Sequence, residues 1–528
     1  MKTLLQSLCF FCLMPISAFA APLSFTVNMS EAVTVSGCPA NCPRIAVDVG
    51  GVTRYASYAS GTGGSALTFT YTPQVGDVDL DGVTVSSPVD LNGGTIVDLN
   101  GNAISDLTFT PPNTANVKIN YPSLGMDFVY DADGRYTLNG TAYNDLSSFL
   151  TAAGGTFSRG SVGTYFDSTG TLQTASANTP RFDHDPVTHA AKGILIEEQR
   201  TNLLAYSEQF DNASWVKSNS TIVANATTAP DGTMTADKLV ENTNNSTHYM
   251  WIAPTMTSGV AYTFSVFLKK AERDIAIIDS DTDGTPGWVY VDLSNGTFGA
   301  QSGTLLSKSI IAVGSDWYKV SISYTADRVA MQPCVFLANN IPSYSYIGDG
   351  TSGIYVWGAQ LEQGAFPTSY IPTTNAAVAR HGDIFQIPYS ANFLSTKGAW
   401  YAEAFNAPDT SFKRIIGTNI ADGYLTYGTN GAALQSWDGV SNMQVTISPS
   451  ASDSIYGKYA LGWDNSTMTR SLVANAGAIG SGGYADGYQQ STAVWIGGAG
   501  GYALNSHVRK AKYYPVRVSD TQLQLLTQ

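Results

Sequence analysis

Two stretches decide the fold of the middle of this chain: GILIEEQRTNLLAYSEQFDNASW (Gly193 to Trp215) and YIGDGTSGIYVWGAQLEQGAFPTSYIPT (Tyr346 to Thr373). They enclose about 130 residues of alternating, aromatic-rich sequence, which is the size and texture of one β-sandwich. Between them, YTFSVFLKK (Tyr262 to Lys270) alternates large apolar residues with smaller or polar ones, and Asn295-Gly296 predicts a hairpin turn. Because the apolar face of such strands must pack on a second sheet, we expect a sandwich over residues 203–375.

The same stretches resemble the jelly-roll, carbohydrate-binding-like modules that recur in tailed-phage and prophage tail proteins. The resemblance extends upstream to Gly154 and includes Arg181-Phe182-Asp183 and Asp185-Pro186, so that it covers residues 154–375. It implies a surface-recognition protein and leaves the ligand open.

The flanking segments have β patterns of their own. Residues 21–120 contain short alternating runs such as LTFTYTP (Leu67 to Pro73), and they resemble bacterial Ig-like domains of adhesins, which implies a stalk. Residues 380–528 contain KYALGWDNSTMTRSLVANA (Lys458 to Ala476) and the strand-like AVWIGG (Ala493 to Gly498), and they are predicted to close with a strand and a short helix that has Ser519 and Gln522 at capping-box spacing. They resemble concanavalin A-like, laminin G-like domains of phage tail and secreted glycan-binding proteins. Residues 121–202 are predicted to form a connector, with a short helix around Leu146 to Leu150 that ends at Gly154-Gly155. The predicted fold class is therefore all-β, with Ig-like, jelly-roll and concanavalin A-like sandwiches and a short helical connector.

Composition and charge narrow the functional class. Only 13% of the residues are charged, Gly is abundant at 51, and the net charge of −14 would repel a phosphate backbone, so nucleic acid is not an expected partner. Residues 1–20 have the pattern of a secretory signal peptide, with an N-terminal membrane anchor as the alternative, and no later stretch is long enough to span a membrane. We therefore expect a secreted protein, extracellular or at the cell surface.

The cysteines agree with export. Cys38 and Cys42 lie four positions apart in CPANCP, which favours a small disulfide over a zinc site because no second ligand pair follows. Cys334 is expected to be unpaired and buried.

Structural calcium is the predicted cofactor. DVDLDG (Asp77, Asp79, Asp81) and DSDTDG (Asp279, Asp281, Asp283) place carboxylates at alternate positions before Gly, which can converge on a hard cation, although a solvated turn rich in Asp is the alternative. The jelly-roll resemblance implies a further calcium site near the first and last strands of that module, where Glu208 and Glu362 lie.

Aromatic residues are the candidate glycan contacts, because flat rings stack on sugar C–H surfaces. Residues expected in loops, and therefore available to a ligand, are Tyr249, Trp251, Trp288, Tyr344 and Tyr346 of the central module and Trp437, Tyr484 and Tyr488 of the last one. Trp317, Trp357, Trp463 and Trp495 lie in strand patterns and are expected to be core residues.

The chain shows no recognisable catalytic motif. The histidines have no HExxH spacing, GxSxG is absent, and Glu403 lacks a partner carboxylate in its strand pattern. We therefore predict a secreted, non-catalytic, lectin-like adhesion protein that binds a polysaccharide or surface glycan and could form a homo-oligomer. The alternatives are a phage or prophage tail component and a polysaccharide hydrolase or lyase.

Overall fold

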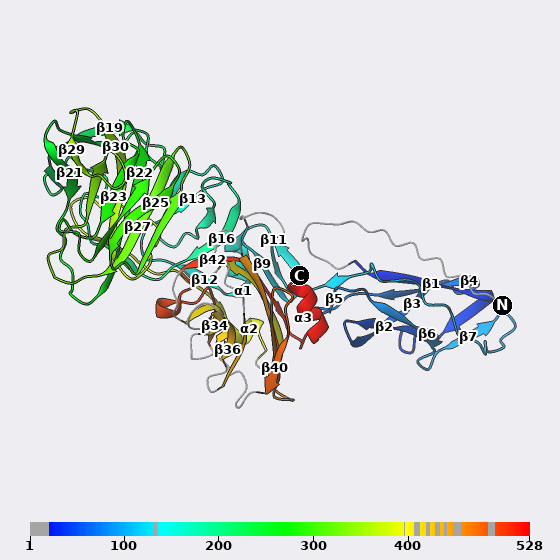
Figure 1. The fold of residues 1–528 in the computed structure, drawn as a ribbon. Coiled ribbons are helices and arrows are strands. Elements are labelled where there is room, and N and C mark those ends of the chain that lie inside the picture. The colour runs from blue at the N-terminus through cyan, green and yellow to red at the C-terminus, as the bar shows by residue number, and fades with distance from the viewer. Residues whose placement is uncertain are drawn as a thin grey trace.

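The molecule is elongated, with one sandwich at each end and a third between them. The computed structural model describes residues 21–129, 135–394, 396–405, 412–418, 423–427, 433–437, 441–446, 456–483 and 492–528, and the predicted signal peptide lies outside them. The N-terminal residues form one end, residues 203–375 form the other, and the C-terminal residues lie in the middle (Figure 1). The chain order and the spatial order of the domains therefore differ.

The N-terminal domain, which we call the N-terminal sandwich, is one six-stranded antiparallel sheet whose strands share a single core. In spatial order its strands are β6 (Thr84–Asp90), β2 (Arg44–Val49), β3 (Val52–Ser60), β4 (Gly64–Tyr71), β1 (Leu23–Ser36) and β7 (Thr95–Asp98). Inward residues such as Val47, Leu67 and Phe69 alternate with exposed ones and form a core that also includes Phe109 and Ile119. A short pair, β5 (Val78–Asp79) with β8 (Ile119–Asn120), lies next to the middle sandwich.

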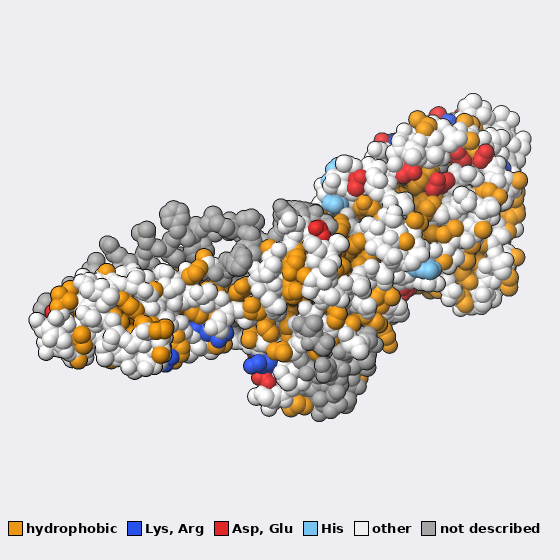
Figure 2. All heavy atoms as spheres, turned by 180° about the vertical axis from the view of Figure 1, so that it is seen from behind, with side chains coloured by type: hydrophobic (Ala, Val, Ile, Leu, Met, Phe, Trp, Pro, Cys, Tyr) orange, Lys and Arg blue, Asp and Glu red, His pale blue; other side chains and the backbone are white. Residues whose placement is uncertain are grey.

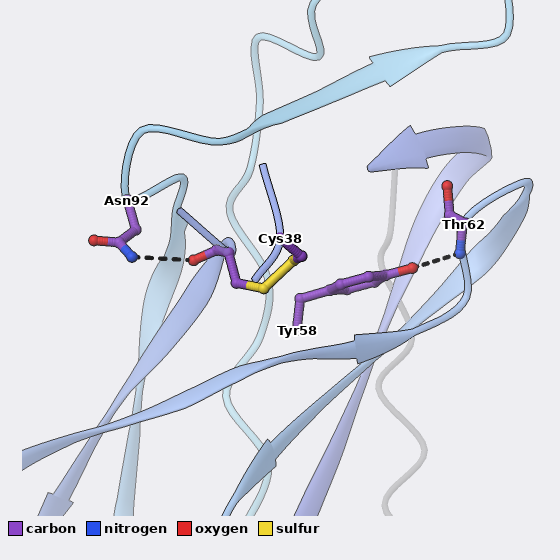
Figure 3. The surroundings of a disulfide bond; sticks show 5 residues. Cys38, Tyr58, Thr62 and Asn92 are labelled. Carbon is purple, nitrogen blue, oxygen red and sulfur yellow. Dashed lines mark hydrogen bonds between the residues drawn. A yellow bond between two sulfur atoms is a disulfide. The ribbon is translucent and has the colours of Figure 1, made fainter. Parts of the chain in front are cut away.

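The predicted disulfide is present in this domain. Cys38 and Cys42 are bonded in the loop after β1, and the main-chain carbonyl of Cys42 accepts a hydrogen bond from the side-chain amide of Asn92 at 3.2 Å (Figure 3). The nearby hydroxyl of Tyr58 accepts a hydrogen bond from the backbone N–H of Thr62 at 2.6 Å. The Ig-like relationship of the domain stays a prediction.

Residues 203–375 form the expected sandwich of two antiparallel sheets. We call the first the aromatic sheet: β18 (Val216–Ser218), β21 (Asn245–Trp251), β28 (Cys334–Ala338), β23 (Ile275–Asp279), β24 (Gly287–Asp292) and β25 (Thr297–Gly303), with β29 (Ser345–Ile347) also paired to β21. The second comprises β19 (Ser220–Thr227), β20 (Ala236–Glu241), β30 (Gly353–Gln363), β22 (Ala261–Lys270), β27 (Trp317–Thr325) and β26 (Ser307–Ala312). Phe264, Val266, Ile278, Val291 and Leu337 pack between the sheets.

The middle sandwich has a ten-stranded and a seven-stranded sheet. Eight of the ten strands follow one another in the order β11 (Thr141–Tyr143), β10 (Tyr136–Leu138), β9 (Leu124–Asp127), β42 (Ser506–Tyr514), β33 (Lys397–Phe405), β38 (Tyr456–Asp464), β39 (Thr469–Ala474) and β40 (Gly480–Gly483). The other two branch from β42: β16 (Ala191–Ile196) pairs with β42, and β15 (Phe182–His184) pairs with β16. The seven are β12 (Thr156–Ser158), β32 (Ile384–Pro388), β41 (Ala493–Ile496), β34 (Lys413–Thr418), β35 (Gly423–Tyr427), β36 (Ala433–Trp437) and β37 (Asn442–Thr446).

This sandwich corrects the predicted domain organisation. Residues 121–202, expected to be a connector, supply β9–β12, β15 and β16 to its sheets, and both β9 and β16 pair with the last strand, β42. Gly193 allows the close approach, because a Cβ at this position would lie 2.3 Å from the carbonyl oxygen of Val508. The jelly roll is therefore an insertion between two parts of one sandwich.

The inserted domain leaves and re-enters the middle sandwich at one place. Its entry strand β17 (Arg200–Asn202) pairs with its exit strand β31 (Val378–Arg380) as a two-stranded ribbon. A second small ribbon, β13 (Gly163–Phe166) with β14 (Leu172–Ala175), lies at the junction of the two domains (Figure 1).

The predicted helices are confirmed. Helix α1 (Leu146–Ala153) starts after Asp145, whose carboxylate accepts the backbone N–H of Ser148 at 2.7 Å, and ends at Gly154 with φ 69°. Helix α3 (Asp520–Leu526) follows Ser519, but the predicted capping box does not form. The short helices α2 (Tyr389–Asn392) and η1 (Gly500–Tyr502) complete the described elements.

Gln522 of α3 instead joins the N-terminal and middle sandwiches. Its side-chain oxygen accepts the backbone N–H of Leu80 at 2.7 Å, and its nitrogen donates to the carboxylate of Asp81 at 2.6 Å. Val78 packs beneath this contact among Tyr514, Leu523 and neighbouring apolar residues of the middle sandwich. None of the helices in the described residues is long and apolar enough to cross a membrane.

Candidate functional site

The aromatic sheet has a second, outward face that is rich in rings. Ala276, Ile278, Val289, Met250 and Val335 point into the jelly-roll core. Because successive side chains of a strand alternate between faces, their neighbours in sequence must lie on the opposite face. These neighbours form a separate cluster, made of Ile275, Ile277, Tyr290, Cys334, Phe336 and Ala338 with the half-buried Tyr249, Trp251 and Trp288.

The strand register orders this cluster into rows. Trp251 is opposite Cys334, Cys334 is opposite Asp279, and Asp279 is opposite Trp288. Since neighbouring strands lie about 4.8 Å apart, the two tryptophans are about 14 Å apart with the Asp279 carboxyl between them. In the next row the rings of Tyr249 and Phe336 stack with centroids 4.3 Å apart and planes inclined by 20°.

Polar groups border the tryptophan row. Burial raises the pKa of Asp279 to about 8, so this carboxyl is largely protonated at neutral pH and can donate a hydrogen bond. Arg328, whose side chain is 39% exposed, bridges Asp281 at 2.8 Å and Asp283 at 2.6 Å. Within the described residues, nothing accepts a hydrogen bond from the indole N–H of Trp251 or Trp288. The face therefore combines partly exposed rings with unused donors and a few charged groups.

Three of the aromatic residues predicted in loops lie on strands instead. Tyr249 and Trp251 are in β21 and Trp288 is in β24, where their rings are only half-buried because they point away from the core. Tyr344 is in a loop and is 41% exposed, with its ring edge-on to Phe336 at 6.1 Å.

Tyr346 is a correction. It lies in β29, is 7% exposed, and donates its hydroxyl to Glu241 at 2.7 Å beneath the guanidinium of Arg273. A ring that is buried and hydrogen-bonded in this way cannot offer a face to a ligand.

The candidates of the middle sandwich are separate from this face. Trp437 lies in β36 and is half-buried, although it was expected in a loop. Tyr484 and Tyr488 lie outside the described residues. Trp317, Trp357 and Trp463 are at most 1% exposed, which confirms them as core residues, whereas Trp495 is half-buried.

The carboxylates of DVDLDG are engaged with protein groups. Asp77 pairs with Arg54 at 2.6 Å and also accepts the hydroxyl proton of Tyr71. Asp79 accepts the backbone N–H groups of Gly50 at 2.8 Å and Gly82 at 2.7 Å, and Asp81 accepts Gln522. These contacts make the loop a joint between the N-terminal and middle sandwiches.

The remaining calcium candidates are also hydrogen-bonded within the protein. Glu208 accepts the hydroxyl of Tyr370 at 2.9 Å, and Glu362 accepts the backbone N–H of Thr368 at 2.8 Å and its hydroxyl at 2.7 Å. Across the residues that the structure describes, no group of three or more His, Cys, Asp or Glu is arranged to hold a metal ion. Calcium stays a prediction of the sequence.

A buried ionic network joins the jelly roll to the middle sandwich, and sequence reasoning did not find it. Arg181 contacts Glu197 at 2.8 Å and Asp383 at 2.5 Å, and Arg159 contacts Asp383 at 3.0 Å. Glu197 also accepts the backbone N–H of Ser369 at 2.7 Å, at the end of the jelly roll. Burial alone would raise the pKa of Glu197, but Arg380 and Arg181 lower it well below its usual range. The only sequence signal was the family-like block that contains Arg181.

Comparisons with known proteins leave the family open. No protein-family model and no curated protein matches the chain. Among solved structures, it is similar to a proposed carbohydrate-binding protein from Bacteroides ovatus, with 13% identity, a TM-score of 0.23, and coverage of 53% of this chain and 79% of that one.

Two further structures are similar to the same degree. Domains LG4-5 of the mouse laminin alpha1 chain give 10% identity and a TM-score of 0.17 over 51% of this chain and 84% of that one. The CBM22-1-CBM22-2 tandem domain of Paenibacillus barcinonensis Xyn10C gives 8% identity and a TM-score of 0.20 over 59% of this chain and 97% of that one. At these TM-scores the similarity carries no functional argument.

Proposed function

We propose that this chain is a glycan-binding protein and that the outward face of the aromatic sheet is its binding surface. The observation that carries the proposal is the row Trp251, Asp279, Trp288, in which two half-buried indoles flank a carboxyl that is largely protonated at neutral pH. Indole faces can stack on sugar C–H surfaces, while the indole N–H groups and the Asp279 carboxyl can hydrogen-bond to hydroxyls.

The electrostatics of the face suit a neutral or weakly charged chain of sugars. Arg328 already bridges the two rim carboxylates, so the face has no strong field of one sign. Figure 2 shows the jelly-roll end at the upper right, where acidic side chains lie among hydrophobic ones. Specificity would then depend on shape and hydrogen bonds more than on charge.

We further propose that the protein acts outside the cell as a surface adhesion protein, with the N-terminal sandwich as a stalk. The disulfide between Cys38 and Cys42 supports this, because such bonds persist in oxidising compartments. Placing the jelly roll at the far end from the stalk would present its face to a surface (Figure 1).

The test is glycan-array binding by the full chain and by the double variant Trp251→Ala with Trp288→Ala. Removing both stacking rings should weaken binding at least about tenfold, while the half-buried positions leave the fold intact. Tyr55→Ala is the matched control, because Tyr55 is a 42% exposed aromatic residue on the N-terminal sandwich. The proposal fails if the full chain binds no glycan, or if the double variant binds as tightly as the unaltered protein.

A further inference from the structure

A cavity of about 380 Å³ lies where the jelly roll meets the middle sandwich, and none of the residues that line it belongs to the aromatic face. Its walls come from the β13–β14 ribbon, from β15 and β16, from the edge strand β26 of the jelly roll and its neighbour β27, and from the start of β42. Figure 1 shows β13, β16 and β42 at this junction. The volume lies within the range of roughly 300–1,000 Å³ that is usual for small-molecule sites, and junctions between domains are a common place for them.

Rings supply much of the wall. They come from three separate parts of the fold: Tyr165, Phe166, Phe267, Phe366, Tyr370 and Phe405. Small hydroxyl side chains such as Thr164, Ser309 and Ser369 lie between them. Aromatic faces interrupted by hydroxyls are the lining that a sugar-sized ligand requires.

Three lysines also line the cavity, and none of them forms an ion pair with a described residue. Lys319 donates its ammonium to the carbonyl oxygen of Thr368 at 2.6 Å. Lys192 lies with its ammonium 5.6 Å from the ring centroid of Phe405. Lys308 is exposed at the rim, over the ring of Phe298. Asp183 and Asp185 attract Lys192, and Glu362 and Glu197 attract Lys319, but no carboxylate of the described residues lies within ion-pair distance of these ammonium groups.

The acidic groups of the wall, by contrast, are already engaged. The carboxylate of Asp183 is hydrogen-bonded to ring nitrogen Nε2 of His507 at 2.7 Å, and it accepts a hydrogen bond from the backbone N–H of Phe166 at 2.7 Å. Glu197 is balanced from behind by Arg181 at 2.8 Å and Arg380 at 3.5 Å. A ligand therefore meets more unpaired positive than unpaired negative charge, although the whole chain has a net charge of −14. Charges further away than about 8 Å are largely screened at physiological salt, so the local lysines dominate.

We propose that this cavity binds a sugar unit that bears a carboxylate, of the hexuronate class. The carboxylate would pair with Lys192 and Lys319, and the ring would pack on the aromatic wall beside the Asp183–His507 pair. The site goes beyond the glycan-binding function of the aromatic sheet, shares no residue with it, and stands or falls independently of it.

The test is calorimetric titration of the full chain with digalacturonate and with methyl glucuronide. The dimethyl ester of digalacturonate, which keeps the rings without the charge, and acetate, which keeps the carboxylate without the ring, separate the two contributions. We expect both hexuronates, or one of them, to bind and the ester and acetate to bind at least about fivefold more weakly. Lys192→Gln should weaken hexuronate binding about fivefold or more, and Lys308→Gln, at the rim, about twofold.

Two control variants show whether a loss of hexuronate binding comes from the cavity itself. Lys270→Gln removes an exposed lysine of the same jelly roll outside the cavity and should leave the affinity unchanged. The double variant Trp251→Ala with Trp288→Ala should also leave it unchanged, which separates this site from the aromatic face. The proposal is overturned if neither hexuronate binds at about 10 mM, if the ester binds equally well, if both lysine variants keep full affinity, or if the tryptophan variant abolishes binding.

Discussion

The outward face of the aromatic sheet and the ionic network at the junction both bury ionisable groups, but they treat them in opposite ways. Asp279 is buried on the face, no cation of the described residues forms an ion pair with it, and burial raises its pKa to about 8. At the junction, Arg159, Arg181 and Arg380 surround Glu197 and Asp383, and Arg380 and Arg181 hold the pKa of Glu197 well below its usual range although burial alone would raise it. The face holds an uncharged polar group between its two tryptophans, whereas the junction pairs buried carboxylates with arginines.

The largest expected effect comes from breaking the network. Arg181→Ala should destabilise the junction by about 3–5 kcal/mol, because it leaves two buried carboxylates without their main partner. Chemical denaturation monitored by tryptophan fluorescence should show a lower midpoint. Since the chain has several domains, the transition that shifts should be the one shared by the jelly roll and the middle sandwich. An unchanged midpoint would mean that the network does not hold the two domains together.

The second prediction tests the protonation state of Asp279, on the outward face of the aromatic sheet, through the pH dependence of stability. Because the pKa of Asp279 is raised in the folded state, the native protein binds more protons than the unfolded chain between about pH 4 and pH 8, and stability falls as pH rises through this window. Asp279→Asn removes the titrating group, so it should stabilise the protein by about 1–2 kcal/mol at pH 9 and have little effect at pH 4. Thermal unfolding at both pH values measures the difference. An equal effect at both would contradict the assigned protonation state.

A smaller effect is expected where the amide side chain of Gln522, rather than a buried ion pair, joins two domains. Gln522→Ala removes the hydrogen bonds to the Leu80 backbone and to Asp81, which should cost about 1–2 kcal/mol. The N-terminal sandwich should loosen from the middle one, which limited proteolysis between residues 120 and 124 can detect. Gln524→Ala is the matched control, because Gln524 is on the same helix and its side-chain nitrogen donates to the carbonyl of Gly477 in the middle sandwich itself.

The smallest change in stability is expected for an exposed ion pair, which contrasts with the buried ionic network. Arg44 and Asp90 form an ion pair at 2.7 Å on the surface, where their side chains are 30% and 46% exposed. Arg44→Ala should change stability by less than about 1 kcal/mol, and about 0.5 M salt should remove the difference. If Arg44→Ala were as costly as Arg181→Ala, burial would not be the property that separates the two kinds of charge.

The local sequence pattern predicted individual helices, turns and buried residues of this protein, but it did not predict which strands pair with each other. The helix at Leu146–Ala153, the Asn295-Gly296 turn and the buried Cys334 all follow from neighbours in sequence. The connector was wrong as a separate unit, because nothing in residues 121–202 indicates that they pair with a strand more than 300 positions later. Trp251 and Trp288 were correctly selected as partly exposed but assigned to loops, since a ring on a strand's outer face breaks the expected alternation of apolar and polar residues.

By itself, the sequence determined that the chain folds into β-sandwiches with few charges, many turns and one small disulfide, because alternation, Gly and Asn positions and cysteine spacing act over a few residues. Only the tertiary structure decided which strands meet. It made the last strand the partner of both β9 and β16, placed Asp279 between two tryptophans from strands that are not adjacent in the chain, and enclosed Lys192 and Lys319 in one cavity. The physical reason is that strand pairing and burial depend on contacts between distant segments, which no local pattern encodes.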